Sequence, residues 1–516
     1  MTTDKAGGTK SAQDILVERI EQARRGGAEK YHQQLAQQNK LFVRDRLTYL
    51  LDPGSFVEDG LLVRSLDDLP ADAVVTGFGR VGGRPVAVIA NDMTVKAGTW
   101  GRRTYQKMTS TQRKADELGI PLIYLVDSAG ARLDEQQYCY AGHDAMGNIF
   151  YNQIQFSGRI PQVCVLFGPS PAGSAYVPAL CDICIMVDKN VSAYLGSPRM
   201  AEMVIGEKVT LEEMGGARMH CVVSGLGDML AQSELEAMDA ARKYLSYFPQ
   251  NWREPPPMAE PKDPVPGRSI EEIVPEKQGV PFDMYELIAR LTDAESWFET
   301  KRLFAPELIT GLARLNGRAI GIVANQPKVK GGVLFVDSSD KAARFVWLCN
   351  AFGIPLLFLC DISGFMIGSH VEKQGIIRHG AKMLFAVAEA KVPRICVVVR
   401  KAYGGGYLAM SGNPMQPDCT IALPTARPAV MGPEAAINAV YYNKIMELPE
   451  EQRAAYIAEK RREYEENIDP YSVASEFFIE DVVPGEVLRQ ELIRRFEMYA
   501  HKRAAPIERR NGVMPV

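Results

Sequence analysis

Short apolar runs rich in Val, Ile and Leu alternate with amphipathic windows along most of the chain. VAVIA at 86–90 and AIGIVA at 319–324 predict buried strands. A helical window follows each run, at 104–118 and 338–352, and after a Gly-Ile-Pro break comes a second apolar run, LIYLVD or LLFLCD. VCVLF and ICVVV predict further strands. Strands that are apolar throughout and alternate with helices predict an α/β fold with covered sheets.

The pattern occurs twice in the sequence. TGFGRVGGRPVAVIAND begins at Thr76 and TGLARLNGRAIGIVANQ begins at Thr310, an offset of 310 − 76 = 234. The offset holds without a gap over about 55 residues and carries Asp127 onto Asp361. A duplicated domain is therefore expected.

Proline marks the boundary between the copies. Residues 252–281 contain eight prolines, a density that blocks helix and central strand. We therefore expect a linker at 256–282 between a first domain at 1–255 and a second domain at 283–516. About fifty residues precede the repeat, and their apolar spacing predicts helices that pack on the first core.

Composition narrows the function classes. Apolar residues make up 46% and charged residues 24% of the 516 residues, as in soluble globular proteins. The net charge of −4 gives no reason to expect nucleic-acid binding. No apolar run is long enough to predict a membrane span, and the polar first ten residues do not resemble a signal segment. Nine cysteines, mostly in apolar runs, predict buried reduced thiols and a cytoplasmic location. Cys181 and Cys184 form a lone CxxC in such a run, so core packing is expected rather than a metal site.

Other motifs have ordinary structural explanations. Residues 77–82 match the GxGxxG pattern, but a strand is predicted directly after them where a dinucleotide site needs a helix, so a hairpin turn at Gly82-Gly83 is favoured. His379 is expected to be structural. The helical window that starts near residue 102 is basic and predicts either a face for a polyanion such as a nucleotide phosphate or a solvated charged face. Its basic residues are Arg102, Arg103, Lys107, Arg113 and Lys114.

Two glycine-rich turns are the strongest candidates for chemistry. Residues 171–176 and 403–408 each follow a predicted buried strand and precede a helical segment. Small residues let a ligand approach the backbone, and the unpaired N–H groups at a helix start stabilise negative charge. The duplicated turns therefore predict two oxyanion holes, with two ordinary tight turns as the alternative.

Several longer stretches resemble one family. DRLTYLLDPGSF, LVDSAGARLDEQ, GPSPAGSAYVPAL, DISGFMIG, IIRHGAK followed by RKAYGGGYLAM, and MGPEAAINAVYY are similar to the carboxyltransferase (β) subunit of biotin-dependent acyl-CoA carboxylases of the propionyl- and methylcrotonyl-CoA type. The resemblance implies two duplicated crotonase-like (ββα spiral) domains in a homohexamer. It implies acyl-CoA over the first half and carboxybiotin over the second half of a neighbouring subunit. Biotin would arrive on a separate biotin carboxylase or carrier subunit, with no metal in this chain and a place in fatty acid metabolism.

The resemblance also assigns residues. It places the two oxyanion holes at Ala172, Gly173, Gly405 and Gly406. It places substrate-binding positions at Ala129, Gly130, Ala131, Ser363, Gly364, Phe365, Tyr407 and Leu408.

The expected reaction moves a carboxyl group from carboxybiotin to the α-carbon, or the vinylogous carbon, of a short-chain acyl-CoA such as propionyl-CoA. Ala172-Gly173 is more similar to methylcrotonyl-type members, so that substrate stays open. A biotin-dependent decarboxylase of the glutaconyl-CoA type shares these motifs. A crotonase-type hydratase and a non-catalytic scaffold are further alternatives.

Overall fold

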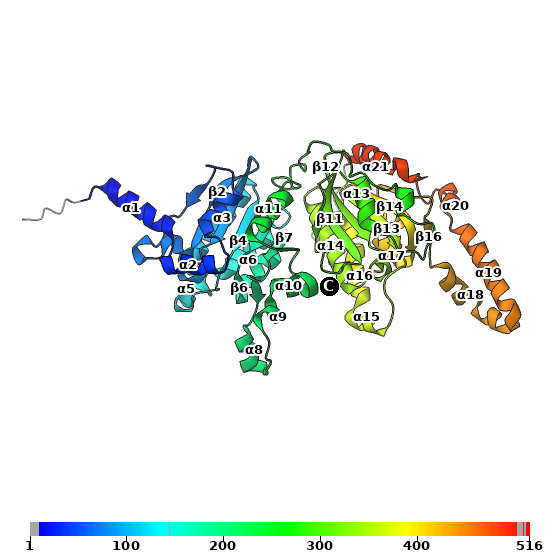
Figure 1. Cartoon of the computed structure of the whole chain (residues 1–516), viewed down its shortest axis with the longest axis horizontal. Coiled ribbons are helices and arrows are strands. Elements are labelled where there is room, and N and C mark those ends of the chain that lie inside the picture. Colours follow the sequence, from blue (N-terminus) through cyan, green and yellow to red (C-terminus); the bar gives the residue numbers. More distant parts are fainter. Residues whose placement is uncertain (1–9, 144, 503–508, 510–511, 516) are drawn as a thin grey trace, which may run out of the picture. The chain divides into compact units, whose positions relative to one another are not determined.

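The computed structural model describes residues 10–143, 145–502, 509 and 512–515, and it divides into two units that meet in sequence at Glu254 and Pro255 (Figure 1). Each unit is built around a sheet with helices beside it.

The first unit contains the following elements. Its strands are β1 (Val57–Asp59), β2 (Val74–Val81), β3 (Arg84–Asn91), β4 (Leu122–Val126), β5 (Gln162–Leu166), β6 (Pro169–Pro171), β7 (Ile183–Val187), β8 (Ser192–Tyr194) and β9 (Met229–Ala231). Its α-helices are α1 (Ala12–Arg25), α2 (Glu29–Gln37), α3 (Val43–Leu50), α4 (Arg102–Leu118), α5 (Gln136–Cys139), α6 (Met146–Phe156), α7 (Tyr176–Leu180), α8 (Pro198–Ile205), α9 (Leu211–Gly215), α10 (Ala217–Met219) and α11 (Glu234–Leu245). Short single turns are η1 (Ser65–Asp67), η2 (Pro70–Ala73), η3 (Lys96–Gly98), η4 (Leu133–Glu135), η5 (Ala172–Ala175) and η6 (His220–Ser224).

The second unit follows the same plan. Its strands are β10 (Phe298–Thr300), β11 (Leu308–Leu315), β12 (Arg318–Asn325), β13 (Leu356–Ile362), β14 (Arg394–Tyr403), β15 (Cys419–Ala422), β16 (Arg427–Ala429) and β17 (Asp481–Val482). Its helices are α12 (Ile270–Ile273), α13 (Met284–Leu291), α14 (Val336–Ala351), α15 (Ser369–Gln374), α16 (Ile376–Glu389), α17 (Gly404–Ala409), α18 (Pro433–Glu447), α19 (Glu450–Asn467), α20 (Pro470–Ser475) and α21 (Gly485–Tyr499), with single turns η7 (Lys330–Gly332) and η8 (Asn413–Met415).

The two sheets have equivalent strand orders. The first runs β1-β2-β3-β4-β5-β7-β9 and the second β10-β11-β12-β13-β14-β15-β17. In each, the first three strands are antiparallel and the later ones join in parallel through helices, which gives the expected ββα unit. The buried strands and the helical windows predicted from the sequence are confirmed.

The GxGxxG segment lies on β2 and in the turn after it. Gly82 and Gly83 both have positive φ, 57° and 78°, as a two-residue type I′ hairpin requires, and β3 follows in register. The hairpin interpretation is confirmed, because no helix opens at these glycines.

The repeat begins earlier than the sequence indicated. β10 pairs with β11 as β1 pairs with β2, and α13 precedes β10 as α3 precedes β1. The offset here is 298 − 57 = 241, whereas it is 308 − 74 = 234 from β2 onwards. The expectation that about fifty residues precede the repeat is therefore wrong. The connection from β1 to β2 is seven residues longer than the one from β10 to β11, so an ungapped comparison of the two copies does not extend back to β1 and α3.

The proline-rich segment is not free of helix. Helix α12 lies within it, and Ser269 caps that helix by accepting the N–H of Glu272. Ile270 and Ile273 are buried in the core of the second unit, packed with apolar residues of α13, α21 and the sheet. Proline still excludes longer helices here, but the four residues between Ser269 and Val274 contain none.

Candidate active site

The first glycine-rich turn follows β6 and forms η5, which leads into α7. Ala172 is exposed and has a φ of 52°, a left-handed conformation that is costly for a residue with a Cβ. A Cβ on Gly173 would lie 2.7 Å from Sδ of Met146 at the start of α6. No side chain caps the start of η5, so the N–H of Gly173 lies in a first turn, where N–H groups have no partner within the helix.

The second turn follows β14 directly and forms α17. Gly404 has a φ of 52°, the same value as Ala172. Gly405 is exposed, whereas Gly406 is buried, and a Cβ on Gly406 would lie 2.9 Å from Cα of Gly364. The backbone therefore pairs Ala172 with Gly404, one residue earlier than the family resemblance pairs the two holes.

Each turn lies beside the loop predicted to flank its substrate. In the first unit a Cβ on Gly130 would lie 3.2 Å from Cγ of Pro171, next to Ala172. In the second unit Gly364 touches Gly406, and the ring of Phe365 lies 3.7 Å from the Cβ position of Gly405. The structure thus brings the predicted loop and the predicted hole together within each unit.

Both loops are held by the same backbone bridge. Trp100 donates its N–H to the carbonyl of Gly130 (2.9 Å) and accepts the N–H of Arg132 (2.8 Å). Leu334 bridges to Phe365 in the same way. In a parallel bridge the middle residue turns its own N–H and carbonyl to the opposite side, so the peptide groups of Ala131 and Phe365 point away from the bridge.

The two pocket residues predicted after the second turn differ in environment. The Tyr407 hydroxyl accepts the N–H of Asn413 at 3.1 Å and its ring packs against Gly412. Burial raises the pKa of Tyr407 above its ordinary value. This geometry gives Tyr407 a packing role, whereas Leu408 is half-buried in the middle of α17.

Two buried carboxylates behind the turns escaped the sequence analysis as functional residues. Asp127 accepts Nη1 of Arg46 at 3.1 Å and is paired with Nζ of Lys40 at 2.6 Å. A Cβ on Gly168 would lie 1.9 Å from its Oδ1, so the strand that leads to the first turn passes directly over this carboxylate.

Asp361 plays the same part in the second unit. It accepts Nη2 of Arg400 at 2.7 Å and the backbone N–H of Lys401 at 3.1 Å. Both aspartates are fully buried at the ends of equivalent strands. The signal in the sequence was the offset of 234 that joins them, each at the end of an apolar run.

A cavity of ≈ 880 Å³ opens beside the second turn. Ser363 and Tyr403 line it together with charged residues of both signs from α18, α19 and the segment before α13. Lys277, Lys401, Arg427, Arg461 and Arg462 are its cations. Five carboxylates, Glu276, Glu434, Glu465, Glu466 and Asp469, balance these cations, so the cavity offers room and polar groups without a net positive charge.

Four of the five basic residues of α4 are exposed, Arg102 and Arg103 in its first turn and Arg113 and Lys114 eleven positions later, on the same side of the helix. Lys107 is buried and its Nζ donates to the carbonyls of Ala71 and Val74, so it is a structural residue. A Glu135 oxygen accepts the backbone N–H of Arg102 at 2.9 Å, while the Arg102 guanidinium lies over the ring of Tyr138. Lys107 therefore belongs to no exposed basic face, and for the other four residues the polyanion-binding and solvated alternatives both stay predictions.

Other candidate groups have ordinary environments. All nine cysteines are free and buried, and Cys164 contacts both thiols of the CxxC. Nδ1 of His379 lies 2.8 Å from an Asp340 oxygen, which links α16 to α14. Within the described ranges, no group of three His, Cys, Asp or Glu side chains is placed to hold a metal, and no helix has the length and apolarity to cross a membrane.

The chain matches the carboxyl transferase domain family over residues 34–514. It is 58% identical to an uncharacterized carboxylase of Bacillus subtilis over 97% of this chain and 98% of that protein. It is 38% identical to the carboxyltransferase subunit of propionyl-CoA carboxylase from Haloferax mediterranei, over 98% and 99% of the two chains. It is also 37% identical to the methylmalonyl-CoA decarboxylase α subunit of Veillonella parvula, over 98% of each.

A solved structure shares the whole fold. The 12S subunit of transcarboxylase, crystallised with methylmalonyl-CoA and methylmalonic acid and described as a hexamer, superposes with a TM-score of 0.93 at 37% identity, over 99% of this chain and 100% of that one. The duplicated crotonase-like fold is therefore confirmed. This chain belongs to the carboxyl transferase family and is a carboxyltransferase subunit of the biotin-dependent acyl-CoA carboxylase type.

Proposed function

We propose that the chain transfers a carboxyl group from carboxybiotin, carried on a separate subunit, to the α-carbon of propionyl-CoA. The observation that carries the proposal is the duplicated turn: Ala172–Ala175 and Gly404–Ala409 each open a helix beside a substrate-flanking loop. A relative that acts on propionyl-CoA and a structure with methylmalonyl-CoA bound support the acyl group.

The reaction needs two sites for negative charge. Carboxybiotin supplies the carboxyl carbon by cleavage of its N–C bond, and the α-proton of the acyl-CoA moves to the ureido group as the new C–C bond forms. Charge develops on the thioester oxygen and on the ureido oxygen. Backbone N–H groups at Ala172-Gly173 and at Gly405-Gly406 are proposed to hold these two oxygens.

No side-chain base is required in this scheme. The buried aspartates Asp127 and Asp361 are each neutralised by arginine, so their role is to fix the strands that lead to the turns. Ser363, beside the ≈ 880 Å³ cavity, and the Ala129–Gly130–Ala131 loop are proposed to flank biotin and CoA respectively.

The assembly is proposed to be a homohexamer in which a first unit meets the second unit of a neighbour. The hexameric 12S structure supports it. A biotin carboxylase with a biotin carrier is the proposed partner, and the buried thiols suit the reducing cytoplasm.

The test is a carboxylation assay with the cognate biotin subunit, over acetyl-, propionyl-, butyryl- and methylcrotonyl-CoA. The highest kcat/KM is expected with propionyl-CoA. A preference for methylcrotonyl-CoA would replace this substrate by the branched one that Ala172 favours in the family.

A biotin-dependent decarboxylase is the second candidate, supported by the Veillonella relative. It predicts that the chain, given methylmalonyl-CoA and free biotin, releases carboxyl faster than the ATP-driven complex adds it. The carboxylation proposal predicts the opposite ratio at saturating propionyl-CoA.

A further inference from the structure

The two copies differ in the length of the connection between their first and second strands. Fourteen residues, 60–73, separate β1 from β2, whereas seven residues, 301–307, separate β10 from β11. The longer connection contains η1 and η2, and Ala71, Asp72 and Ala73 all have positive φ, between 51° and 62°. Three consecutive left-handed residues are costly, so the surrounding structure must hold them in place.

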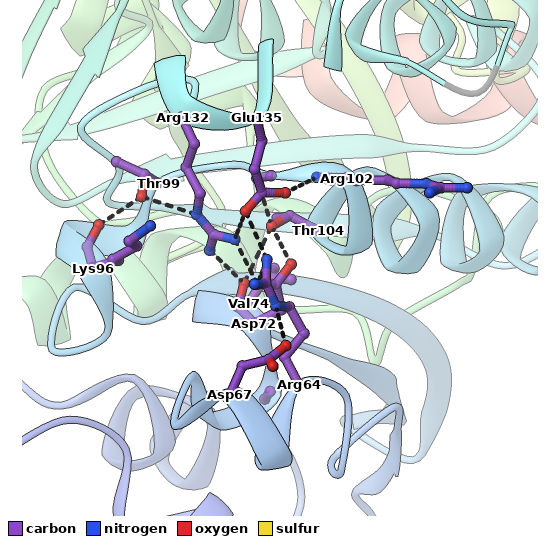
Figure 2. Close-up of polar contacts among 12 residues, drawn as sticks. Arg64, Asp67, Asp72, Val74, Lys96, Thr99, Arg102, Thr104, Arg132 and Glu135 are labelled. Carbon is purple, nitrogen blue, oxygen red and sulfur yellow. Dashed lines mark hydrogen bonds and ion pairs between the residues drawn. The ribbon is translucent and has the colours of Figure 1, made fainter. Parts of the chain in front are cut away.

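Asp72 is the acidic centre of this connection. It is fully buried and accepts Nη1 of Arg132 at 2.6 Å and the hydroxyl of Thr104 at 2.8 Å, as Figure 2 shows. Nη2 of Arg132 also donates to the Asp72 carbonyl at 3.3 Å. The arginine side chain is 1% exposed, so the pair is shielded from solvent and its geometry is fixed.

Further charges complete the cluster. Glu135 accepts Nη1 of Arg64 at 2.6 Å and Nη1 of Arg132 at 3.3 Å, and its other oxygen accepts the N–H of Arg102 at the start of α4. Nε of Arg132 donates to Thr99 at 3.3 Å. The guanidinium of Arg132 is therefore held by the inserted connection, by the residues before α4 and by Glu135.

Arg132 directly follows the loop that faces the first turn. The backbone N–H of Arg132 donates to the carbonyl of Trp100. This hydrogen bond is part of the bridge in which the peptide groups of Ala131 point away from Trp100. Ala129 and Ala131 are exposed, whereas Gly130 and Arg132 are buried. Fixing Arg132 thus fixes the part of the backbone that lies beside Pro171 and Ala172.

The second copy lacks this ion pair. At the offset of 234, Pro306 stands for Asp72 and Met366 for Arg132. The buried lysine of the first copy is retained, since Lys341 corresponds to Lys107 and also binds two carbonyls. The second copy therefore lacks the ion pair that holds the loop but keeps the buried lysine, so it has not lost its buried polar residues in general.

We propose that Asp72 and Arg132 are positioning residues that set the affinity of the first copy for acyl-CoA. The inference rests on the proposed function, because it takes the first unit as the acyl-CoA side. The pair touches no substrate; it holds the Ala129–Gly130–Ala131 backbone where a polar group of the acyl-CoA meets it.

The test uses the full chain with Arg132→Met, which installs the residue of the second copy, together with Arg132→Lys and Asp72→Asn. Calorimetric titration with propionyl-CoA is expected to show Kd raised about 10- to 100-fold for Arg132→Met and less for Arg132→Lys. In the reverse assay, in which methylmalonyl-CoA donates its carboxyl group to free biotin, KM for methylmalonyl-CoA should rise while KM for biotin stays within about twofold.

Asp293→Asn is the matched control. It weakens a buried ion pair in the second unit, Asp293 with Arg489 at 2.7 Å, and is expected to lower thermal stability without changing Kd for propionyl-CoA. If wild type binds propionyl-CoA and Arg132→Met binds it equally well, the positioning inference is overturned. Equal changes in both KM values, or a Kd change in the control, would overturn it too. If wild type binds no acyl-CoA, the proposed function fails and the inference fails with it.

Discussion

Buried lysines show how far a residue's role depends on its surroundings. Lys107 and Lys341 occupy equivalent positions on α4 and α14, and each donates to two backbone carbonyls at or just before the start of the second strand. Burial lowers the pKa of each lysine to about 8. They stabilise left-handed segments of the chain rather than bind substrate.

The lowered pKa of Lys341 makes stability depend on pH. Between about pH 8 and its ordinary value of 10.5, the unfolded lysine binds a proton that the folded one has lost, so the free energy of unfolding rises with pH. Relative to Lys341→Met, wild type is expected to gain up to about 1.4 kcal/mol per pH unit in that window and nothing below it. Urea denaturation at several pH values measures the difference; equal slopes for the two proteins would contradict it. Lys114→Met, at an exposed lysine, is the control.

Gly405 and Gly406 are expected to respond differently to a methyl group. A Cβ at Gly405 meets Phe365 at an ordinary 3.7 Å, whereas at Gly406 it lies 2.9 Å from the Gly364 backbone. Gly405→Ala should therefore keep activity within about threefold, and Gly406→Ala should lose about tenfold or more because the biotin-side loop is displaced. Steady-state kinetics with free biotin compare the two variants. A lower activity for Gly405→Ala than for Gly406→Ala would show that the close approach of Gly406 to Gly364 does not control activity.

At the scale of elements, each hairpin is fixed by one carboxylate from the helix before it. Asp52, after α3, accepts the N–H groups of Gly82 and Gly83, and Asp293, after α13, accepts those of Asn316 and Gly317. The two aspartates are joined by the offset of 241, which confirms that the helices belong to the repeat.

Asp293 is expected to matter more for stability than Asp52. It is 3% exposed and is also paired with Arg489, whereas Asp52 lies at the surface. Asp293→Asn should cost about 2–4 kcal/mol of unfolding free energy and Asp52→Asn clearly less. Thermal and urea unfolding of the two variants measure this, and equal losses would show that the buried ion pair adds nothing.

Sequence periodicity predicted the regular elements well because apolar runs and glycine turns are local signals. The hairpin at Gly82-Gly83 and both glycine-rich turns follow from a few adjacent residues each. The pairings of Asp127 with Arg46 and of Asp72 with Arg132 did not follow, because they join residues 81 and 60 positions apart. Helix α12 was missed because proline content was averaged over the whole segment.

At the scale of the whole molecule, exposed apolar side chains of the first unit favour an interface in the proposed homohexamer. Met203, Val204 and Ile205 at the end of α8 are each at least 70% exposed. Val222 and Val223 of the same unit are also exposed. A surface of this kind is typical of an interface, and the proposed homohexamer provides an occupant.

Val204→Asp is expected to shift the assembly towards smaller species, because a charge buried in an interface is costly. Light scattering or mass photometry measures the mass distribution. Leu118→Asp is the control, since it changes an exposed leucine at the end of α4. A Val204→Asp protein of unchanged mass would show that α8 lies outside the interface.

The central claim is that backbone N–H groups, rather than acid–base side chains, hold the charge of the reacting partners, and Gly405 tests it most directly. Proline is tolerated in the first turn of a helix, so Gly405→Pro removes one donor from α17, while Gly405→Ala retains it. The account predicts that Gly405→Pro lowers kcat about 10²- to 10³-fold with biotin as acceptor, while Gly405→Ala stays near wild type and both variants keep the wild-type melting temperature and mass. A Gly405→Pro protein as active as Gly405→Ala would contradict it.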